Sequence, residues 1–138
     1  MDKDLREKLH RLEALRQEIL LLERQLQELQ TIKDSLLAVA AMLEKLKQLK
    51  EKGEEKEVYV NLGAGIYLKA VPRLQEKLLV KIDPVIFIEQ DIEEAEKLVK
   101  ENIEKLEERL TAAEKEKEKL IQEYKKLAAE ISSLSRSS

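Results

Sequence analysis

The stretch that decides the fold is Val60-Asn61-Leu62-Gly63-Ala64-Gly65-Ile66-Tyr67-Leu68-Lys69-Ala70. On both sides of its glycine-containing centre, apolar residues alternate with polar or aromatic ones. A period of two is typical of a β-strand, and glycine between two such runs is typical of a tight turn. The stretch therefore predicts a β-hairpin. Gly63 and Gly65 are interpreted as turn residues, because a phosphate-binding glycine loop would have a helix after the first strand.

A second hairpin repeats the first at an offset of 20 residues. Val60-Asn61-Leu62 aligns with Val80-Lys81-Ile82 without a gap. The following strand, Ile66-Tyr67-Leu68-Lys69, aligns in the same way with Ile86-Phe87-Ile88-Glu89. The second turn contains Asp83-Pro84 in place of the glycines. Residues 57–90 are therefore predicted to form two consecutive hairpins.

The two hairpins carry more apolar side chains than they can bury alone. Isolated hairpins are marginally stable, and their edges have unpaired backbone groups. A pair of helices offers no broad surface to cover them, so we expect hairpins of other subunits to do so. The residues predicted to mediate this assembly are Val58, Val60, Leu62, Ile66, Leu68, Val80, Ile82, Ile86 and Ile88.

Before the hairpins, residues 4–52 predict one long amphipathic helix. Its apolar residues recur in alternating steps of four and three, the heptad spacing that keeps an apolar stripe facing a partner helix. The stripe consists of Leu15, Ile19, Leu22, Leu26, Leu29, Leu36, Ala40 and Leu43. Lys33 interrupts it once, and a slip of phase is expected upstream. Beyond that slip the stripe continues through Leu5, Leu9 and Leu12.

After the hairpins, residues 91–134 predict a second helix of similar length. Asp91 is suited to cap its first turn, and Gly53 is suited to end the first helix. The heptad stripe of the second helix consists of Ile92, Val99, Ile103, Leu106, Leu110, Ala113, Leu120, Tyr124, Leu127, Ile131 and Leu134, with Lys117 as a polar exception. At about 1.5 Å per residue both helices would be roughly 65–75 Å long, which suits an antiparallel pair.

The expected fold class is therefore α+β, in a single subunit of residues 1–138. It is a long antiparallel coiled-coil hairpin of helices, with two β-hairpins inserted between them. With 40% charged and 3% aromatic residues, the chain is not expected to form a compact globular core.

Composition also excludes several kinds of site. There is no cysteine, hence no disulfide, no cysteine-ligated zinc and no thiol nucleophile. The single histidine, His10, lies off the heptad stripe and is expected to be solvated. The 26 basic and 29 acidic residues are interspersed, which gives no electrostatic reason to expect nucleic acid or an anionic membrane as a partner. We expect no catalysis, cofactor or metal, and a cytoplasmic protein.

The order of a long helix, two β-hairpins and a long helix resembles the α-class subunits of prefoldin, the archaeal and eukaryotic cytosolic chaperone. The β-class has one hairpin. Residues 60–70 are similar to the first-hairpin motif of the family. Ile86-Phe87-Ile88-Glu89 and the following Asp91-Ile92-Glu93-Glu94-Ala95 resemble the end of the second hairpin and the next helix start. The turn Asp83-Pro84-Val85 departs from the glycine-containing turn usual in the family.

The resemblance implies a hexamer of two α-class and four β-class subunits, whose hairpins join into an intersubunit β-barrel. Non-native client proteins would be held at the tips of the coiled coils without ATP, and then passed to a group II chaperonin. Because the hairpins would lie at the opposite end of an antiparallel pair, the tips would be the two chain ends. The apolar residues expected there are Leu5, Leu9, Leu12, Leu127, Ile131 and Leu134.

Two other classes remain open. A homo-oligomeric or filamentous prefoldin-like scaffold would use the same hairpins without a partner subunit. A coiled-coil arm that binds nucleic acid is a further alternative, and the balanced charge of the helices speaks against it.

Overall fold

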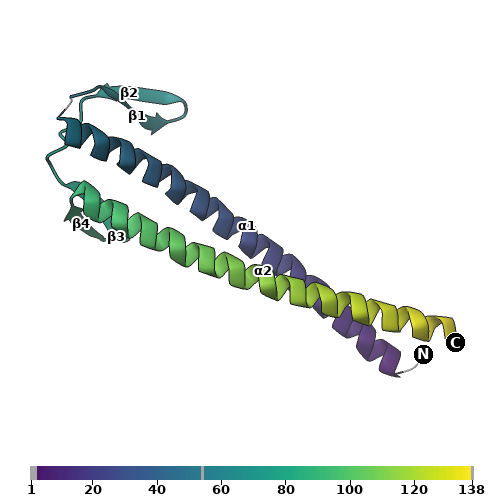
Figure 1. Ribbon diagram of the computed structural model, residues 1–138. Helices are drawn as coiled ribbons and strands as arrows, with labels where there is room; N and C mark the ends of the chain where they lie inside the picture. Colours follow the sequence, from purple (N-terminus) through teal and green to yellow (C-terminus); the bar gives the residue numbers. More distant parts are fainter. Residues whose placement is uncertain (1–2, 54, 138) are drawn as a thin grey trace. The chain divides into compact units, whose positions relative to one another are not determined.

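The structure, a computed structural model, describes residues 3–53 and 55–137. Helix α1 (Lys3–Lys52) comes first and helix α2 (Ile92–Ser137) comes last (Figure 1). Between them lie the strands of two hairpins, which are β1 (Val58–Gly63), β2 (Ile66–Ala70), β3 (Leu78–Asp83) and β4 (Ile86–Gln90). The predicted class, two long helices with two inserted β-hairpins, is confirmed.

The chain divides into two compact units, and both helices contribute to each. One unit, the terminal unit, combines residues 1–34 with residues 105–138. The other, the hairpin unit, consists of Ser35–Glu104 and contains all four strands. Within both units the helices pack along the predicted heptad stripes.

In the terminal unit the apolar stripes of the two helices form a narrow core. Its fully or nearly buried side chains are Leu15, Leu26, Leu106 and Leu120. Ion pairs cross from α1 to α2 along its edges: Lys8–Glu130 at 3.4 Å, Arg11–Glu123 at 3.2 Å, Glu23–Lys117 at 3.7 Å and Lys33–Glu107 at 3.6 Å. As the residue number rises on α1 its partner's number falls on α2, so the helices are antiparallel, as predicted.

The polar residues in the stripes are the ones that reach across to the other helix. Lys33 and Lys117 each occupy a stripe position and pair with a glutamate of the opposite helix. Their side chains are about one quarter exposed. A polar residue at such a position specifies the register of a coiled coil at some cost in stability. These two lysines therefore help to fix which residues of α1 and α2 face each other.

The slip of phase predicted near the N-terminus is wrong. The half-buried residues there are Leu5, Lys8 and Leu12, which continue the heptad spacing of Leu15 without interruption. Leu9 is 39% exposed and lies beside the stripe. The apolar character of Leu9 suggested a change of phase. The structure instead accommodates the aliphatic stem of Lys8 in the stripe, while its ammonium group reaches Glu130.

In the hairpin unit the helices meet through Leu43, Ile92, Ala95 and Ile103, all buried. Both predicted helix ends are present. The amide of Gly53, at φ 65°, donates to the carbonyl of Lys50 at 3.2 Å. The Oδ1 atom of Asp91 accepts from the amide of Glu94 at 2.8 Å, which is the bond of an N-cap residue.

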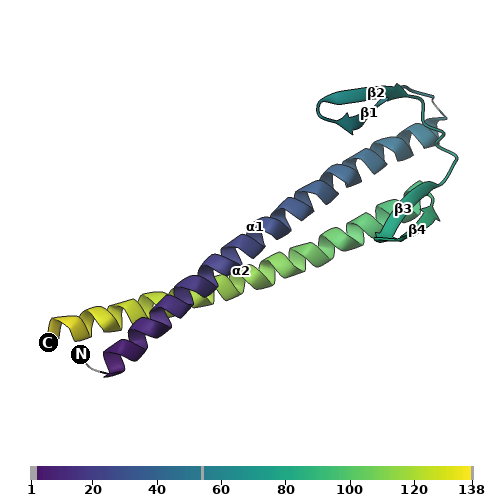
Figure 2. The same ribbon diagram turned by 180° about the vertical axis from the view of Figure 1, so that it is seen from behind.

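The hairpins form two separate two-stranded antiparallel sheets (Figure 2). Val60 pairs with Leu68 in the first hairpin, and Val80 pairs with Ile88 in the second. Each sheet has an irregularity just before its turn. The repeat seen in the sequence is therefore also a repeat of strand register.

The two turns differ in backbone conformation. In the first, Gly63, Ala64 and Gly65 all have positive φ angles, of 98°, 53° and 79°. The second turn, in which Asp83 Oδ1 accepts from the amide of Val85 at 3.3 Å, has no positive φ angle among the described residues. Proline at its centre is compatible with that conformation because its ring fixes φ near −65°.

Replacing Lys33 with leucine tests the role of the polar stripe position. We expect the free energy of unfolding to rise by about 1 kcal/mol, because an apolar side chain replaces a partly buried ammonium group. Urea unfolding followed by circular dichroism at one protein concentration measures the change. Lys45→Leu, at an exposed position of the same helix, is the matched control and should leave stability nearly unchanged. A destabilised Lys33→Leu variant would show that the Lys33–Glu107 pair outweighs apolar packing.

Candidate functional site

The residues predicted to mediate assembly lie on the hairpins and are largely uncovered. Exposed members are Val60, Leu62, Ile66, Leu68, Ile82 and Ile86, with relative exposures between 44% and 60%. The half-buried members are Val58, Val80 and Ile88. Large exposed apolar surface of this kind marks interaction sites in proteins. We call these nine residues the hairpin apolar set.

Strand pairing brings members of the set onto one face of each hairpin. Directly opposite residues of an antiparallel pair point to the same side of the sheet. The pairs Val60↔Leu68 and Val80↔Ile88 are therefore equivalent in the two hairpins. Covering a valine, leucine or isoleucine side chain fully contributes about 1.5–3 kcal/mol. A second sheet placed on these faces would thus be stabilised by several such contributions.

The opposite face of each hairpin is also exposed, and this was not predicted. In the first hairpin Lys69 lies 5.7 Å from the ring centre of Tyr59, and in the second Lys81 lies 5.8 Å from that of Phe87. Leu79 and Val85 are the most exposed large apolar residues of the described chain, at 68% and 83%. The signal was present in the sequence, because the strand residues among them alternate with the predicted set; Val85 lies in the second turn. Both hairpins therefore have exposed side chains on each face, although Val58, Val80 and Ile88 are half-buried.

The residues predicted at the coiled-coil tips lie at both chain ends of the terminal unit. Leu5 and Leu12 on α1 are half-buried in the stripe, and Leu9 is exposed beside it. The α2 members, Leu127, Ile131 and Leu134, are also half-buried. Interior stripe residues such as Leu15 are buried almost completely. Other interior stripe residues, such as Ile19, Leu22 and Leu29, are half-buried like the tip residues. Apart from the exposed Leu9, the tip residues are therefore covered about as well as much of the interior stripe.

A buried carboxylate lies in the hairpin unit, where α1 and α2 meet. Glu96 is only 6% exposed and occupies a stripe position. Its Oε1 atom accepts from Lys47 at 3.4 Å and from Lys100 at 3.3 Å. Its Oε2 atom and Oε1 of Gln90 are buried without a hydrogen-bond partner. Such groups are costly to bury, so the two lysines are needed to keep Glu96 charged.

Opposing effects act on the pKa of Glu96. Burial raises it, whereas interactions with Glu44, Lys100 and Lys47 lower it. The hydrogen bonds and the charge of Lys100 outweigh burial, so that the pKa lies below its ordinary value of 4.5. On the other side of the pair, the hydrogen bond with Glu96 raises the pKa of Lys47. Both shifts favour the charged ion pair.

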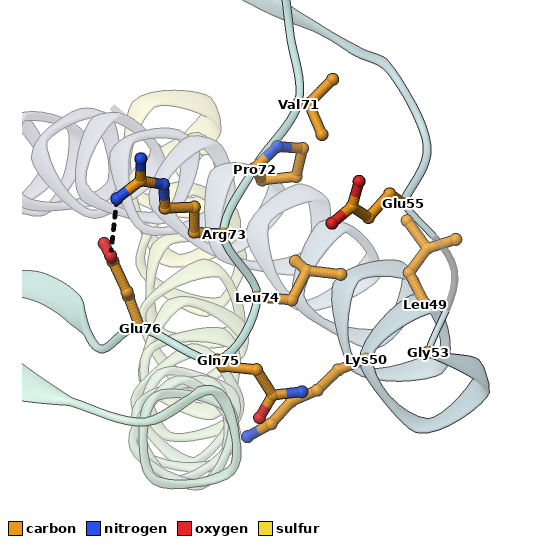
Figure 3. A pocket seen from close by; sticks show the side chains of 10 residues that line it. All are labelled: Leu49, Lys50, Gly53, Glu55, Val71, Pro72, Arg73, Leu74, Gln75 and Glu76. Carbon is orange, nitrogen blue, oxygen red and sulfur yellow. Dashed lines mark hydrogen bonds and ion pairs between the residues drawn. The ribbon is translucent and has the colours of Figure 1, made fainter.

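A pocket of about 690 Å³ lies between the end of α1 and the linker that joins the hairpins (Figure 3). Leu49 and Lys50 of α1 line it together with Gly53, which follows the helix, and Val71–Glu76 line it from the linker. Within the linker Arg73 pairs with Glu76 at 3.3 Å. The lining is mixed, with apolar side chains beside charged ones, and contains no arrangement of a nucleophile and a base.

No group of three or more histidine or acidic residues suited to a metal ion is found in residues 3–53 and 55–137. His10 is exposed there, as expected. In the same part of the chain, neither helix has an apolar run that could span a membrane.

Comparisons with known proteins agree with this architecture. The Prefoldin family model, described as prefoldin subunit, matches residues 15–137. The chain belongs to the prefoldin family. A curated relative from Archaeoglobus fulgidus, named prefoldin subunit alpha, is 30% identical over 107 residues, which cover 78% of this chain and 76% of the relative. Another protein of that name, from Thermofilum pendens, is 32% identical over 62% of this chain and 64% of its own length.

A solved structure shares the fold over nearly its whole length. It is a chain from the cryo-EM structure of filamentous PFD from Methanocaldococcus jannaschii, with a TM-score of 0.68 and 25% identity. The match covers 91% of this chain and 98% of that chain. The predicted resemblance to α-class prefoldin subunits is therefore confirmed. Membership of this chaperone family supports a chaperone-type function.

The lowered pKa of Glu96 predicts that acid weakens the hairpin unit. A carboxylate whose pKa is lower in the folded chain stabilises the fold above its unfolded pKa, and that contribution is lost as the pH falls through the folded pKa. Wild-type stability should therefore decline as the pH falls from about 5, with a smaller decline in Glu96→Gln. Urea unfolding at several pH values measures this. Glu104→Gln, at an exposed position of α2, is the control, and a decline equally reduced in both variants would contradict the assignment to Glu96.

Proposed function

We propose that the chain is the α-class subunit of a cytoplasmic, ATP-independent holdase. It assembles through its hairpins with β-class prefoldin subunits, in a hexamer of two α-class and four β-class subunits with a shared β-barrel. The complex binds non-native proteins and passes them to a group II chaperonin. The observation that carries the proposal is the hairpin apolar set, of which the chain leaves six of the nine members exposed. A subunit with this surface needs other hairpins before its apolar side chains leave water.

The tip residues are the proposed client-binding surface. Non-native proteins expose apolar side chains that would otherwise aggregate. Leu5, Leu12, Leu127, Ile131 and Leu134 retain partial exposure, and Leu9 is exposed. Each contact with a client would be weak because so little area is available on one subunit. Several arms that act on one client would raise the effective affinity without any new contact.

A second candidate is a homo-oligomer or filament of this chain alone. The observation that favours it is the structural match to a chain of a filamentous PFD, which extends over 98% of that chain. Light scattering of the purified chain, with and without an equimolar β-class subunit, separates the candidates. A defined hexamer formed only in the mixture supports the first candidate. Long polymers of the chain alone, unchanged by the β-class subunit, support the second.

Lysine on the hairpin faces should prevent assembly. In the double variant Val60→Lys and Val80→Lys, each ammonium group would have to leave water when hairpins join, at a cost of several kcal/mol. Native mass spectrometry should show dissociated subunits. The control Gln48→Lys and Gln75→Lys adds the same charge at exposed positions outside the strands, and should assemble normally. A wild-type mass for the hairpin variant would rule out assembly through these faces.

Removal of the tips should weaken client binding and leave assembly intact. Deleting residues 1–12 and 128–138 removes most tip residues and retains at least four heptads on each helix, which is enough to pair. Light scattering of a heat-denatured client should fall in the presence of the full complex, with or without ATP. The truncated complex should suppress scattering only partly, because partner subunits keep their tips. Full suppression by the truncated complex would mean that clients bind elsewhere. If the full complex suppressed scattering only when ATP is present, an ATP-independent holdase would be excluded.

A further inference from the structure

Helix α1 carries a second heptad stripe that does not face α2. Beginning at Ile32, apolar or small residues recur in steps of three, four, three, four and three. The members are Ile32, Ser35, Val39, Met42, Leu46 and Leu49, which we call the second stripe. The stripe that packs against α2 contains the neighbouring positions Leu36, Ala40 and Leu43. The two stripes follow different sides of the same helix, because residues one position apart point about 100° apart.

The second stripe is exposed over most of its length. Ile32, Val39 and Met42 have relative exposures of 50%, 42% and 61%. Not one charged residue occurs from Ser35 to Leu43, although 40% of the whole chain is charged. A solvated helix surface would be expected to carry charged side chains on this side. This segment of α1 therefore has the composition of a helix packed on more than one side.

No other helix of the chain is available to cover the second stripe. Every large apolar side chain that is exposed on a helix, within residues 3–53 and 55–137, belongs to α1. The outward side of α2 in the hairpin unit is mainly glutamate and lysine, such as Lys97, Glu101 and Glu104. Among the described residues of this chain, a matching stripe for a coiled-coil contact exists on α1 and not on α2, so a second copy of α1 offers one.

The C-terminal end of the second stripe reaches the pocket beside the linker. Leu49 is both the last stripe residue and a lining residue of that pocket, where Val71, Pro72 and Leu74 also contribute apolar surface (Figure 3). Most of the stripe, from Ser35 onward, belongs to the same compact unit as the hairpins. Hairpins that join two copies would therefore bring two second stripes into the same region of the assembly.

We propose that the second stripe packs against the second stripe of another copy of this chain, in a two-fold contact between α1 helices. The inference rests on the proposed assembly through the hairpins. Regular heptad spacing with β-branched residues at Ile32 and Val39 favours a defined helix over the varied segments of a non-native client. A two-fold contact uses the same patch on both subunits, which fits a chain with one such stripe.

The size of the stripe sets its role. It spans 18 residues, or about 27 Å at 1.5 Å per residue. Six side chains are far fewer than the roughly 20–30 residues that each partner contributes to a standard stable interface. The stripe therefore cannot hold two copies together alone. It strengthens a contact that the hairpins begin, and it selects pairs in which two chains of this class are neighbours.

Crosslinking tests the contact directly, because the chain contains no cysteine. Met42→Cys should give a covalent dimer with a short bismaleimide in the assembled complex. Leu37→Cys is the matched control, since Leu37 is 45% exposed on α1 but lies outside the second stripe. At least tenfold more dimer from Met42→Cys is expected. Equal yields, or no dimer within an intact complex, would overturn the inference and leave hairpin assembly standing.

Charge substitution provides the second measurement. Val39→Lys with Met42→Lys should lower the affinity between subunits about tenfold, measured as the concentration at which the complex dissociates. The control pair Leu20→Lys and Leu37→Lys changes two residues of equal exposure, 45% each, outside the stripe and should dissociate as the wild type does. If the stripe variant assembles normally and loses client suppression, the stripe binds clients and the inference fails. If instead the variant Val60→Lys with Val80→Lys stays assembled, the proposal of assembly through the hairpins fails. The Met42→Cys crosslink still tests the contact between second stripes.

Discussion

A two-stranded sheet cannot bury apolar side chains on its own, and the way this chain assembles depends on that constraint. Both faces of each hairpin contact solvent in the single chain, so apolar residues such as Val60 and Leu68 pair across the strands without leaving water. The rest of the chain relieves this only in part: Val58, Val80 and Ile88 are half-buried, whereas the other six members of the hairpin apolar set stay exposed. Burial of the hairpins therefore depends on other subunits, which explains why a chain with so small an internal core belongs to a family of oligomeric chaperones.

In the helices, the polar side chains determine the register in which α1 and α2 pair. An uninterrupted leucine stripe would allow α1 and α2 to slide by a heptad with little loss. Lys33 and Lys117 oppose this because their ion pairs with Glu107 and Glu23 both form in the observed alignment. Glu96 has a similar effect in the hairpin unit, where displacement from Lys47 would leave this buried carboxylate with Lys100 of its own helix as its remaining lysine partner. A few polar side chains thus define a geometry that apolar packing alone would leave ambiguous.

Much of the architecture was predictable because it depends on local periodicity. Steps of three and four identified the helices, alternation identified the strands, and Gly53 and Asp91 identified helix ends. The course of the stripe at Lys8 was not predicted, because residue type suggested Leu9 and only packing shows that a lysine stem fits. The second stripe on α1 was also missed. When a helix has apolar residues on two sides, the heptad spacing of one stripe is hard to distinguish from that of the other. Which surfaces stay exposed depends on packing in three dimensions, and spacing along the chain does not determine it.

The contrast between the two turns affects how freely each hairpin tip can change during evolution. Three successive residues in the left-handed region restrict the first tip to glycine and a few tolerant residues, because most side chains are strained there. The second tip has ordinary backbone angles and is held by Asp83 and Pro84, so the residue at Val85 can vary without backbone strain. The backbone conformation therefore restricts which residues the first tip can contain, whereas the second tip can accumulate substitutions. Divergence in partner choice among related subunits would arise most readily at the second tip.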